Sequence, residues 1–202
     1  MLEAAELQQV TRSIWLWQAY DPAIKSDLFS CALLTPIGLF LVDPIRLAPA
    51  AFAELKTGGR PAGVLVTNSN HLRYSAVLAQ QEQIPIFAAQ AVTRQPGGIK
   101  MRALRDRAEI GPALMAITIE GAVEGELAFH FADQGGTLVV GDALINVKPY
   151  GFSLLPAKYC ADQRQMRHSL RRLLDFAFER LLFAHGEPLV RAARTRLEAL
   201  LR

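Results

Sequence analysis

Residues 64–74 read Val-Leu-Val-Thr-Asn-Ser-Asn-His-Leu-Arg-Tyr, and this stretch decides the fold class. Its first four residues are apolar or β-branched, which is typical of a short buried strand. The run ends at Asn68 in small polar residues, and the apolar spacing of residues 73–83 predicts a helix. A strand that ends in a polar loop before a helix is a common place for a site in α/β folds. We therefore expect this loop, with the amide oxygens of Asn68 and Asn70 on one side, to carry function.

The rest of the chain adds strands and helices on both sides of this unit. Residues 84–87 predict another strand, so residues 64–87 form a β-α-β unit with parallel strands. Further strands are expected at 10–20, 28–35, 39–42, 114–119, 126–131, 137–140 and 181–184, and helices at 49–55, 163–180 and 188–201, with a break at 95–98. Two similar halves, each a mixed sheet with helices outside, would form an αββα sandwich. The pattern itself supports both α/β and α+β folds.

Length and composition indicate one globular domain over residues 1–202. Hydrophobic residues make up 51% of the chain and charged residues 20%, which excludes a disordered protein. No apolar run approaches the roughly 20 residues that span a bilayer, and residues 1–9 lack the pattern of a signal peptide. Cys31 and Cys160 are too few and too far apart for a disulfide framework. We expect two reduced thiols in a cytoplasmic protein that does not enter a membrane.

The net charge of +3 is unevenly distributed along the chain. From Lys158 onward there are ten Lys or Arg and five Asp or Glu, whereas the preceding part is slightly acidic. A basic C-terminal segment can meet an anionic substrate, a nucleic acid or a protein partner. It can equally be the solvated face of two surface helices, which is the interpretation we favour.

Four stretches in this order resemble the metallo-β-lactamase superfamily of metal-dependent hydrolases. Leu-Val-Asp-Pro at residues 41–44 is similar to the family's strand-ending aspartate, and residues 64–73 stand where the family has Thr-His-x-His-x-Asp-His. Leu-Val-Val-Gly-Asp at 138–142 is similar to the strand whose aspartate bridges two metals, and Leu-Phe-Ala-His-Gly at 182–186 is similar to a Gly-His-Gly turn. The resemblance implies an α/β fold, a four-layer αββα sandwich of two mixed β-sheets with helices outside.

The metal ligands of that family are largely absent from this chain. Placed residue by residue, the first two histidines fall on Asn68 and Asn70, and the next aspartate and histidine fall on Leu72 and Arg73. A further histidine position falls near Ala122.

Among the positions that the resemblance identifies as ligands, only Asp142 and His185 still carry the residue type that the family has there. His71 lies at a spacer position, and we expect its side chain to point away from the metal. A dizinc site needs about three protein ligands per metal, and neutral amide oxygens suit calcium or magnesium better than zinc. The resemblance implies a hydrolase, but the missing ligands leave open whether the chain is an enzyme.

The leading hypothesis is therefore a protein of this fold whose dizinc site is largely lost and whose activity is lost or altered. Arg73 is expected to pair with Asp142 in place of a metal. The residual cleft, which would bind a small and anionic ligand, is expected to include Asn68, Asn70, His71, Arg73, Asp142 and His185. In this hypothesis no cofactor is held at full occupancy.

Two alternatives come from other classes of function. The first is a mononuclear hydrolase of a small ester, lactone or phosphoester, with one Zn, Mn, Fe or Mg ion on Asp142, His185 and the oxygen of Asn68 or Asn70. The second is an interaction protein that uses the basic C-terminal helices. We do not expect nucleic acid as the partner, because aromatic residues do not interleave with that basic face. A homo-oligomer remains open.

Overall fold

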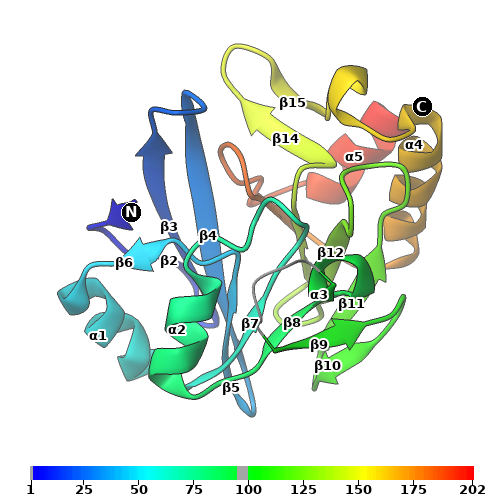
Figure 1. Ribbon diagram of the computed structural model, residues 1–202. Helices are drawn as coiled ribbons and strands as arrows, with labels where there is room; N and C mark the ends of the chain where they lie inside the picture. Colours follow the sequence, from blue (N-terminus) through cyan, green and yellow to red (C-terminus); the bar gives the residue numbers. More distant parts are fainter. Residues whose placement is uncertain (1, 95–99) are drawn as a thin grey trace.

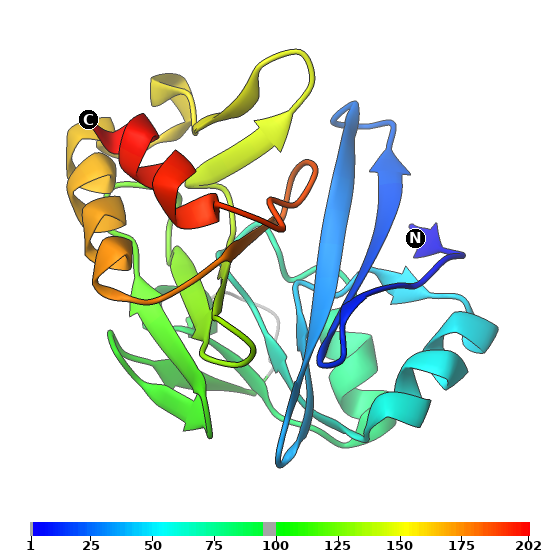
Figure 2. The same ribbon diagram turned by 180° about the vertical axis from the view of Figure 1, so that it is seen from behind.

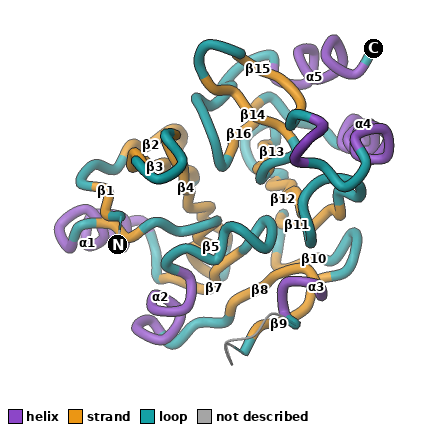
Figure 3. Tube along the Cα trace, turned by 45° about the horizontal axis from the view of Figure 1, so that its top comes forward, coloured by secondary structure: helices purple, strands orange, loops and turns teal. Residues whose placement is uncertain are grey.

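Helices and sheets form four layers in the computed structural model, which describes residues 2–94 and 100–202. Helices α1 (Pro49–Gly58) and α2 (Ser75–Glu82) lie on one side of two facing sheets, and α4 (Gln163–Arg171) and α5 (Ala193–Leu201) lie on the other side (Figures 1 and 2). Figure 3 shows the same separation in the Cα trace. The predicted α/β class and four-layer αββα sandwich are confirmed.

The first sheet has seven strands in the order β2-β3-β4-β5-β7-β8-β9. Their bounds are Gln8–Thr11, Ile14–Asp21, Ser26–Thr35, Gly38–Val42, Pro61–Leu65, Ile86–Ala89 and Met101–Leu104. The strands from β2 to β5 pair antiparallel, and those from β5 to β9 pair parallel. The predicted β-α-β unit is therefore present as β7, α2 and β8.

The second sheet has five strands in the order β10-β11-β12-β13-β16. Their bounds are Glu109–Gly111, Leu114–Thr118, Leu127–Phe131, Thr137–Val140 and Arg180–Phe183. Only the last pair, β13 with β16, is parallel. Two short pairs complete the structure, β1 (Glu3–Ala4) with β6 (Arg46–Leu47) and β14 (Leu144–Val147) with β15 (Gly151–Leu154). A short helix, α3 (Gln90–Thr93), precedes β9.

Along the strands of the second sheet, successive side chains pack alternately into two different hydrophobic clusters. On β12 and β16, Phe129 and Leu182 belong to the cluster that fills the space between the sheets, while Ala128 and Leu181 belong to the cluster under α4 and α5. This alternation follows from the two-residue period of a strand that is buried on both faces.

Several sequence predictions about elements are wrong or incomplete. The helix predicted over 163–180 ends at Arg171 and continues only as the 3-10 turn Arg172–Asp175, because Arg180 is buried in β16 and donates to Thr137 Oγ1 (2.9 Å). The final helix starts at Ala193 instead of residue 188, because Leu189 pairs with Leu181. Residues 10–20 form parts of two strands, and the β14–β15 hairpin was not predicted. The break predicted at 95–98 lies outside the described residues.

Within the described residues, no helix combines the length and apolar character needed to cross a membrane.

Candidate metal centre

Four strand ends bring the polar residues of the site together. Asp43 follows β5, His71 lies in the loop after β7, Asp142 follows β13, and His185 follows β16. Because β5 and β7 are parallel, and β13 and β16 are parallel, the carboxyl ends of each pair lie at one edge of its sheet. A backbone hydrogen bond from the Phe29 amide to the Ala184 carbonyl (2.9 Å) joins the two sheets at this edge.

His71 points into the site, so the prediction that it would point away is wrong. The residue is 3% exposed, and its Nε2 lies 3.4 Å from Asp142 Oδ1. The prediction rested on the spacer position of His71 in the family motif, between Asn68 and Asn70 on one side and Leu72 and Arg73 on the other. Instead the loop turns after Asn68, whose carbonyl accepts a hydrogen bond from the His71 amide (3.2 Å). This turn moves His71 to the side of the surviving ligand positions.

His185 completes a cluster with His71 and Asp142. Its Nε2 lies 3.3 Å from Asp142 Oδ1, and the centroids of the two imidazole rings are 5.4 Å apart. Among the described residues this trio qualifies as a potential metal-binding group, with all its ligand atoms within 4.8 Å of one another. Two imidazole nitrogens and one carboxylate oxygen are a donor set that proteins use for divalent transition metals.

Asp43 and Thr67 determine which nitrogen of His71 faces the cluster. The Thr67 amide donates to Asp43 Oδ1 (2.8 Å), which fixes the carboxylate at the end of β5. His71 Nδ1 lies 3.1 Å from Asp43 Oδ2 and 2.8 Å from Thr67 Oγ1. A proton on Nδ1 satisfies these acceptors and leaves Nε2 free as a ligand, an arrangement that metal-binding histidines commonly adopt.

Neither asparagine of the loop offers its oxygen to the cluster. Asn68 Oδ1 accepts a hydrogen bond from the Asn70 amide (2.9 Å), while its Nδ2 donates to Glu126 Oε2 (2.7 Å) and Asp142 Oδ2 (3.0 Å). Asn70 itself is exposed. The alternative in which an asparagine oxygen binds the metal therefore finds no support in this geometry.

Arg73 does not pair with Asp142 within the part of the chain that the structure describes. Its guanidinium donates instead to three backbone carbonyls, those of Phe29 (2.6 Å), Asp43 (3.0 Å) and Ala184 (3.4 Å). These carbonyls belong to strands of both sheets or to the residues that follow them, so the side chain bridges the sheets. Arg73 therefore links the backbone segments of the two sheets beside the site.

Glu126 is a site residue that the sequence analysis missed. It precedes β12, is 1% exposed, and accepts hydrogen bonds from the Asn68 side chain and from the Ala143 amide (3.0 Å). Burial and the nearby charge of Asp142 raise the pKa of the Glu126 carboxyl. The only signal in the sequence is a charged residue directly before an apolar strand, and that signal is common at strand ends.

The charged groups of the cluster shift the pKa values of one another. Burial alone would lower the pKa of His71, but the charge of Asp43 and hydrogen bonds to Asp142 and Asp43 raise it to about 9. Burial alone would raise the pKa of Asp142, but hydrogen bonds from His185 and His71 hold it well below its usual range. The site therefore favours a cationic group beside an ionised Asp142.

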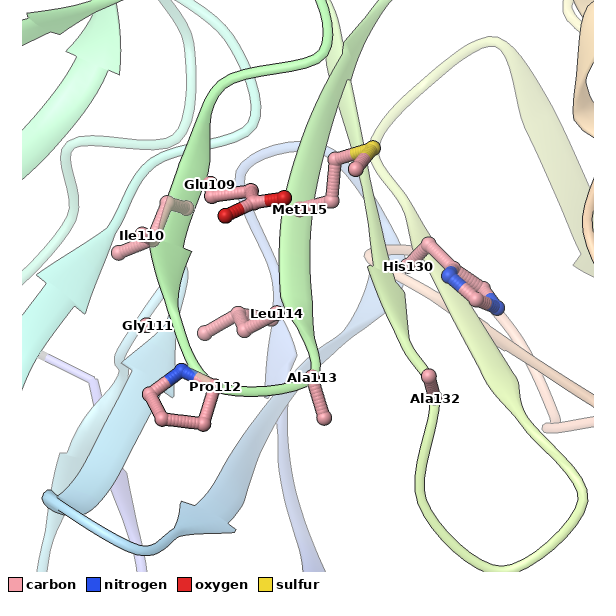
Figure 4. A pocket seen from close by; sticks show the side chains of 9 residues that line it. All are labelled: Glu109, Ile110, Gly111, Pro112, Ala113, Leu114, Met115, His130 and Ala132. Carbon is pink, nitrogen blue, oxygen red and sulfur yellow. The ribbon is translucent and has the colours of Figure 1, made fainter.

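A separate groove of about 550 Å³ lies along the β10–β11 hairpin (Figure 4). The side chains of Glu109, Met115 and His130 line it together with the apolar turn that joins the two strands. His130 is already engaged there, because its Nε2 lies 2.9 Å from the Ala177 carbonyl and its ring packs against Phe176. None of the lining residues belongs to the His71–Asp142–His185 cluster.

The fold and the cluster together define a two-sheet α/β sandwich with a His–Asp–His group where the strand ends of both sheets meet. The sequence profile described as the metallo-beta-lactamase superfamily matches residues 8–202. The chain belongs to the metallo-β-lactamase superfamily. No curated protein sequence matches it.

Solved structures with the same fold are remote in sequence. The DIM-1 metallo-β-lactamase shares 12% identity at a TM-score of 0.75, with 100% of this chain and 98% of that chain covered. FIM-1 from Pseudomonas aeruginosa in its mono-zinc form shares 14% at 0.70, covering 97% and 94%. A metallo-β-lactamase family protein from Thermus thermophilus shares 18% at 0.68, covering 96% and 79%. At such identities the likeness shows the fold.

Proposed function

We propose that this protein has lost the dinuclear centre of its superfamily and holds one divalent cation with His71, Asp142 and His185. The proposal depends mainly on one observation: three donor atoms lie within 4.8 Å of one another, each in a segment that follows a different strand. The contacts of His71 Nδ1 with Asp43 and Thr67 support the proposal, because they leave Nε2 of His71 facing the cluster.

The donor set fits one cation and does not fit two. At the positions where the resemblance places further ligands, Leu72 and Ala122 carry no donor atom, and Arg73 is a cation. The Asn68 oxygen is already occupied by the Asn70 amide. A second divalent ion would therefore lack protein ligands and would lie near the Arg73 guanidinium, which repels it.

A cation bound by two imidazoles and one carboxylate supplies Lewis-acid chemistry, which suits hydrolysis of a small ester, lactone or phosphoester. His185 and Asp142 form the open side of the site, since their side chains remain 16% and 11% exposed. Asp43 and Thr67 lie behind His71 and hold the proton at Nδ1. Glu126 is buried behind Asn68 and does not reach a substrate.

A second candidate is a metal-free binding site, and the environment of His71 favours it. The ring lies between the carboxylates of Asp43 (3.1 Å) and Asp142 (3.4 Å), and its pKa of about 9 makes it an imidazolium at neutral pH in the absence of metal. In this candidate a proton takes the place of the cation, and the cleft binds a small anion.

Metal analysis separates the two candidates. Protein purified without chelators and titrated separately with Zn²⁺, Mn²⁺, Fe²⁺ and Mg²⁺ in a calorimeter should bind close to one equivalent of one of these ions. The variants His71→Ala, Asp142→Ala and His185→Ala should each lose that binding. His168→Ala, at an exposed histidine of α4, is the matched control and should bind as the unchanged protein does.

Three results would contradict the single-cation proposal. The first is a stoichiometry of two, and the second is undiminished binding after loss of His71 or His185. The third is no binding of Zn²⁺, Mn²⁺, Fe²⁺ or Mg²⁺, which would support the metal-free candidate instead. Hydrolysis of model esters, lactones and phosphoesters would then be measured on whichever form binds.

A further inference from the structure

We infer that Asn68 and Glu126 are positioning residues that orient the Asp142 carboxylate toward His71 and His185. This inference rests on the proposed cation centre, and it gives a role to the two residues that the ligand set leaves out. Neither residue is expected to contact the cation or a substrate.

A closed ring of hydrogen bonds carries the inference. Asn68 Nδ2 donates to Asp142 Oδ2 (3.0 Å) and to Glu126 Oε2 (2.7 Å). The other oxygen of Glu126, Oε1, accepts from the amide of Ala143 (3.0 Å), which is covalently bonded to Asp142. The ring therefore begins and ends at Asp142 and fixes both its side chain and the backbone that follows it.

The orientation of the Asn68 amide follows from its neighbours. The Asn70 amide donates to Asn68 Oδ1 (2.9 Å), which identifies that atom as the acceptor. Both hydrogens of Nδ2 are then directed to the two carboxylates. As a result Asp142 Oδ2 is satisfied by Asn68, and Oδ1 is left to face both histidine nitrogens at 3.3 and 3.4 Å.

Gly141 provides the space that the ring requires. A Cβ atom at this position would lie 2.6 Å from Thr67 Oγ1 and 2.9 Å from Glu126 Oε1, so any side chain would displace one of them. Glu126 is 1% exposed and Asn68 is fully buried. Neither residue is open to solvent, so neither can contact a substrate directly. Their effect on the centre therefore passes through Asp142.

The first test is zinc affinity measured by calorimetry. Asn68→Ala removes the donor, and Glu126→Gln keeps the shape but cannot accept from both Asn68 and Ala143. Both variants should bind Zn²⁺ about 10- to 100-fold more weakly, the range typical for residues that orient a metal ligand. Glu124→Gln, at an exposed residue two positions from Glu126, is the matched control and should change affinity less than about 2-fold.

The second test does not require metal. In protein treated with a chelator, the ring ¹⁵N shifts of His71 and His185 report their contact with Asp142. Asn68→Ala and Glu126→Gln should change the Nε2 shifts of both rings, whereas Glu124→Gln should leave them unchanged. If Asn68→Ala does not fold, Glu126→Gln alone decides the outcome.

The two tests distinguish this inference from the proposed function. If the unchanged protein binds no metal, the cation centre is wrong and the ring shifts alone decide whether Asp142 is oriented by Asn68 and Glu126. If both variants bind zinc as the unchanged protein does, or both leave the ring shifts unchanged, the inference is overturned.

Discussion

His71 illustrates how one residue can serve a site from a position that a motif treats as a spacer. Its ring reaches the cluster because the loop turns at Asn68, and its Nδ1 is held by Asp43 and Thr67. The composition of the loop predicted a functional segment, but the direction of a side chain depends on backbone angles that residue types do not specify. Asp142 and His185 were predicted as ligands because the resemblance places them at positions where the family has metal ligands and both residues can bind a metal.

The charge of His71 makes the stability of the metal-free protein depend on pH. Because its pKa is about 9 in the folded state against 6.5 ordinarily, its stabilising contribution is complete below pH 6.5 and is lost as pH rises to 9. Glu126, whose pKa is also raised, acts in the same direction. The shift of His71 alone should lower the free energy of unfolding by about 3 kcal/mol between pH 6.5 and 9.

Denaturant unfolding at several pH values, with a chelator present, measures this fall. The variant His71→Gln cannot take up the proton, so its unfolding free energy should decrease less steeply over the same range. Equal slopes for the variant and the unchanged protein would show that His71 is not the titrating group.

Arg73 is expected to contribute to stability through the backbone. Arg73→Met keeps the aliphatic part but leaves the carbonyls of Phe29, Asp43 and Ala184 without the guanidinium donor. The free energy of unfolding should decrease by about 2–4 kcal/mol. Arg105→Met, at an exposed arginine, should change it by less than about 0.5 kcal/mol. A small effect of Arg73→Met in urea unfolding would contradict this structural role.

Among the elements, strands were easier to predict than helix ends. The strands of the core are short apolar runs bounded by Gly, Pro or Asp, and the structure places most of them within a few residues of the prediction. The helix over 163–180 was predicted too long, because Phe178 continues the apolar spacing of α4 although it packs from a loop. The spacing of apolar residues shows which residues are buried. It does not show whether a buried residue lies in a helix or in a strand.

The start of α4 packs closely against a glycine in the loop between β11 and β12. Gly121 has φ +82°, and a Cβ there would lie 2.3 Å from the Asp162 carbonyl oxygen and 2.5 Å from the Met166 amide nitrogen. Gly121→Ala should therefore shift the helix and lower the free energy of unfolding by about 3 kcal/mol.

Gly151→Ala is the matched control for this substitution. Gly151 also has a positive φ, +67°, but a Cβ there meets nothing within 4 Å. Its substitution should cost only the backbone strain of about 1 kcal/mol. Equal losses in thermal unfolding would mean that the close approach to α4 is unimportant.

At the scale of the whole molecule, the candidate centre connects the two sheets. His71 lies in the loop after β7 of the seven-stranded sheet, whereas Asp142 and His185 follow strands of the five-stranded sheet. A cation bound only by the folded protein stabilises it by about 2.7 kcal/mol at a free concentration 100 times the Kd. For a chain of this length the Tm should rise by about 5–10 °C.

Calorimetric melting with zinc and with a chelator measures this shift. The variant His71→Ala should melt at the same temperature under both conditions. A zinc-dependent shift that persists in this variant would place the stabilising ion elsewhere on the protein.

Because its residues follow strands that are distant in the sequence, the centre can form only after all of these strands have paired. Its residues come from the loop after β7, the end of β13 and the end of β16, and the last of them lies close to the C-terminus. During synthesis the seven-stranded sheet can pair before His185 has been made, but the ligand set cannot close until the final strand docks. Capture of a cation would then follow the docking of β16 beside β13.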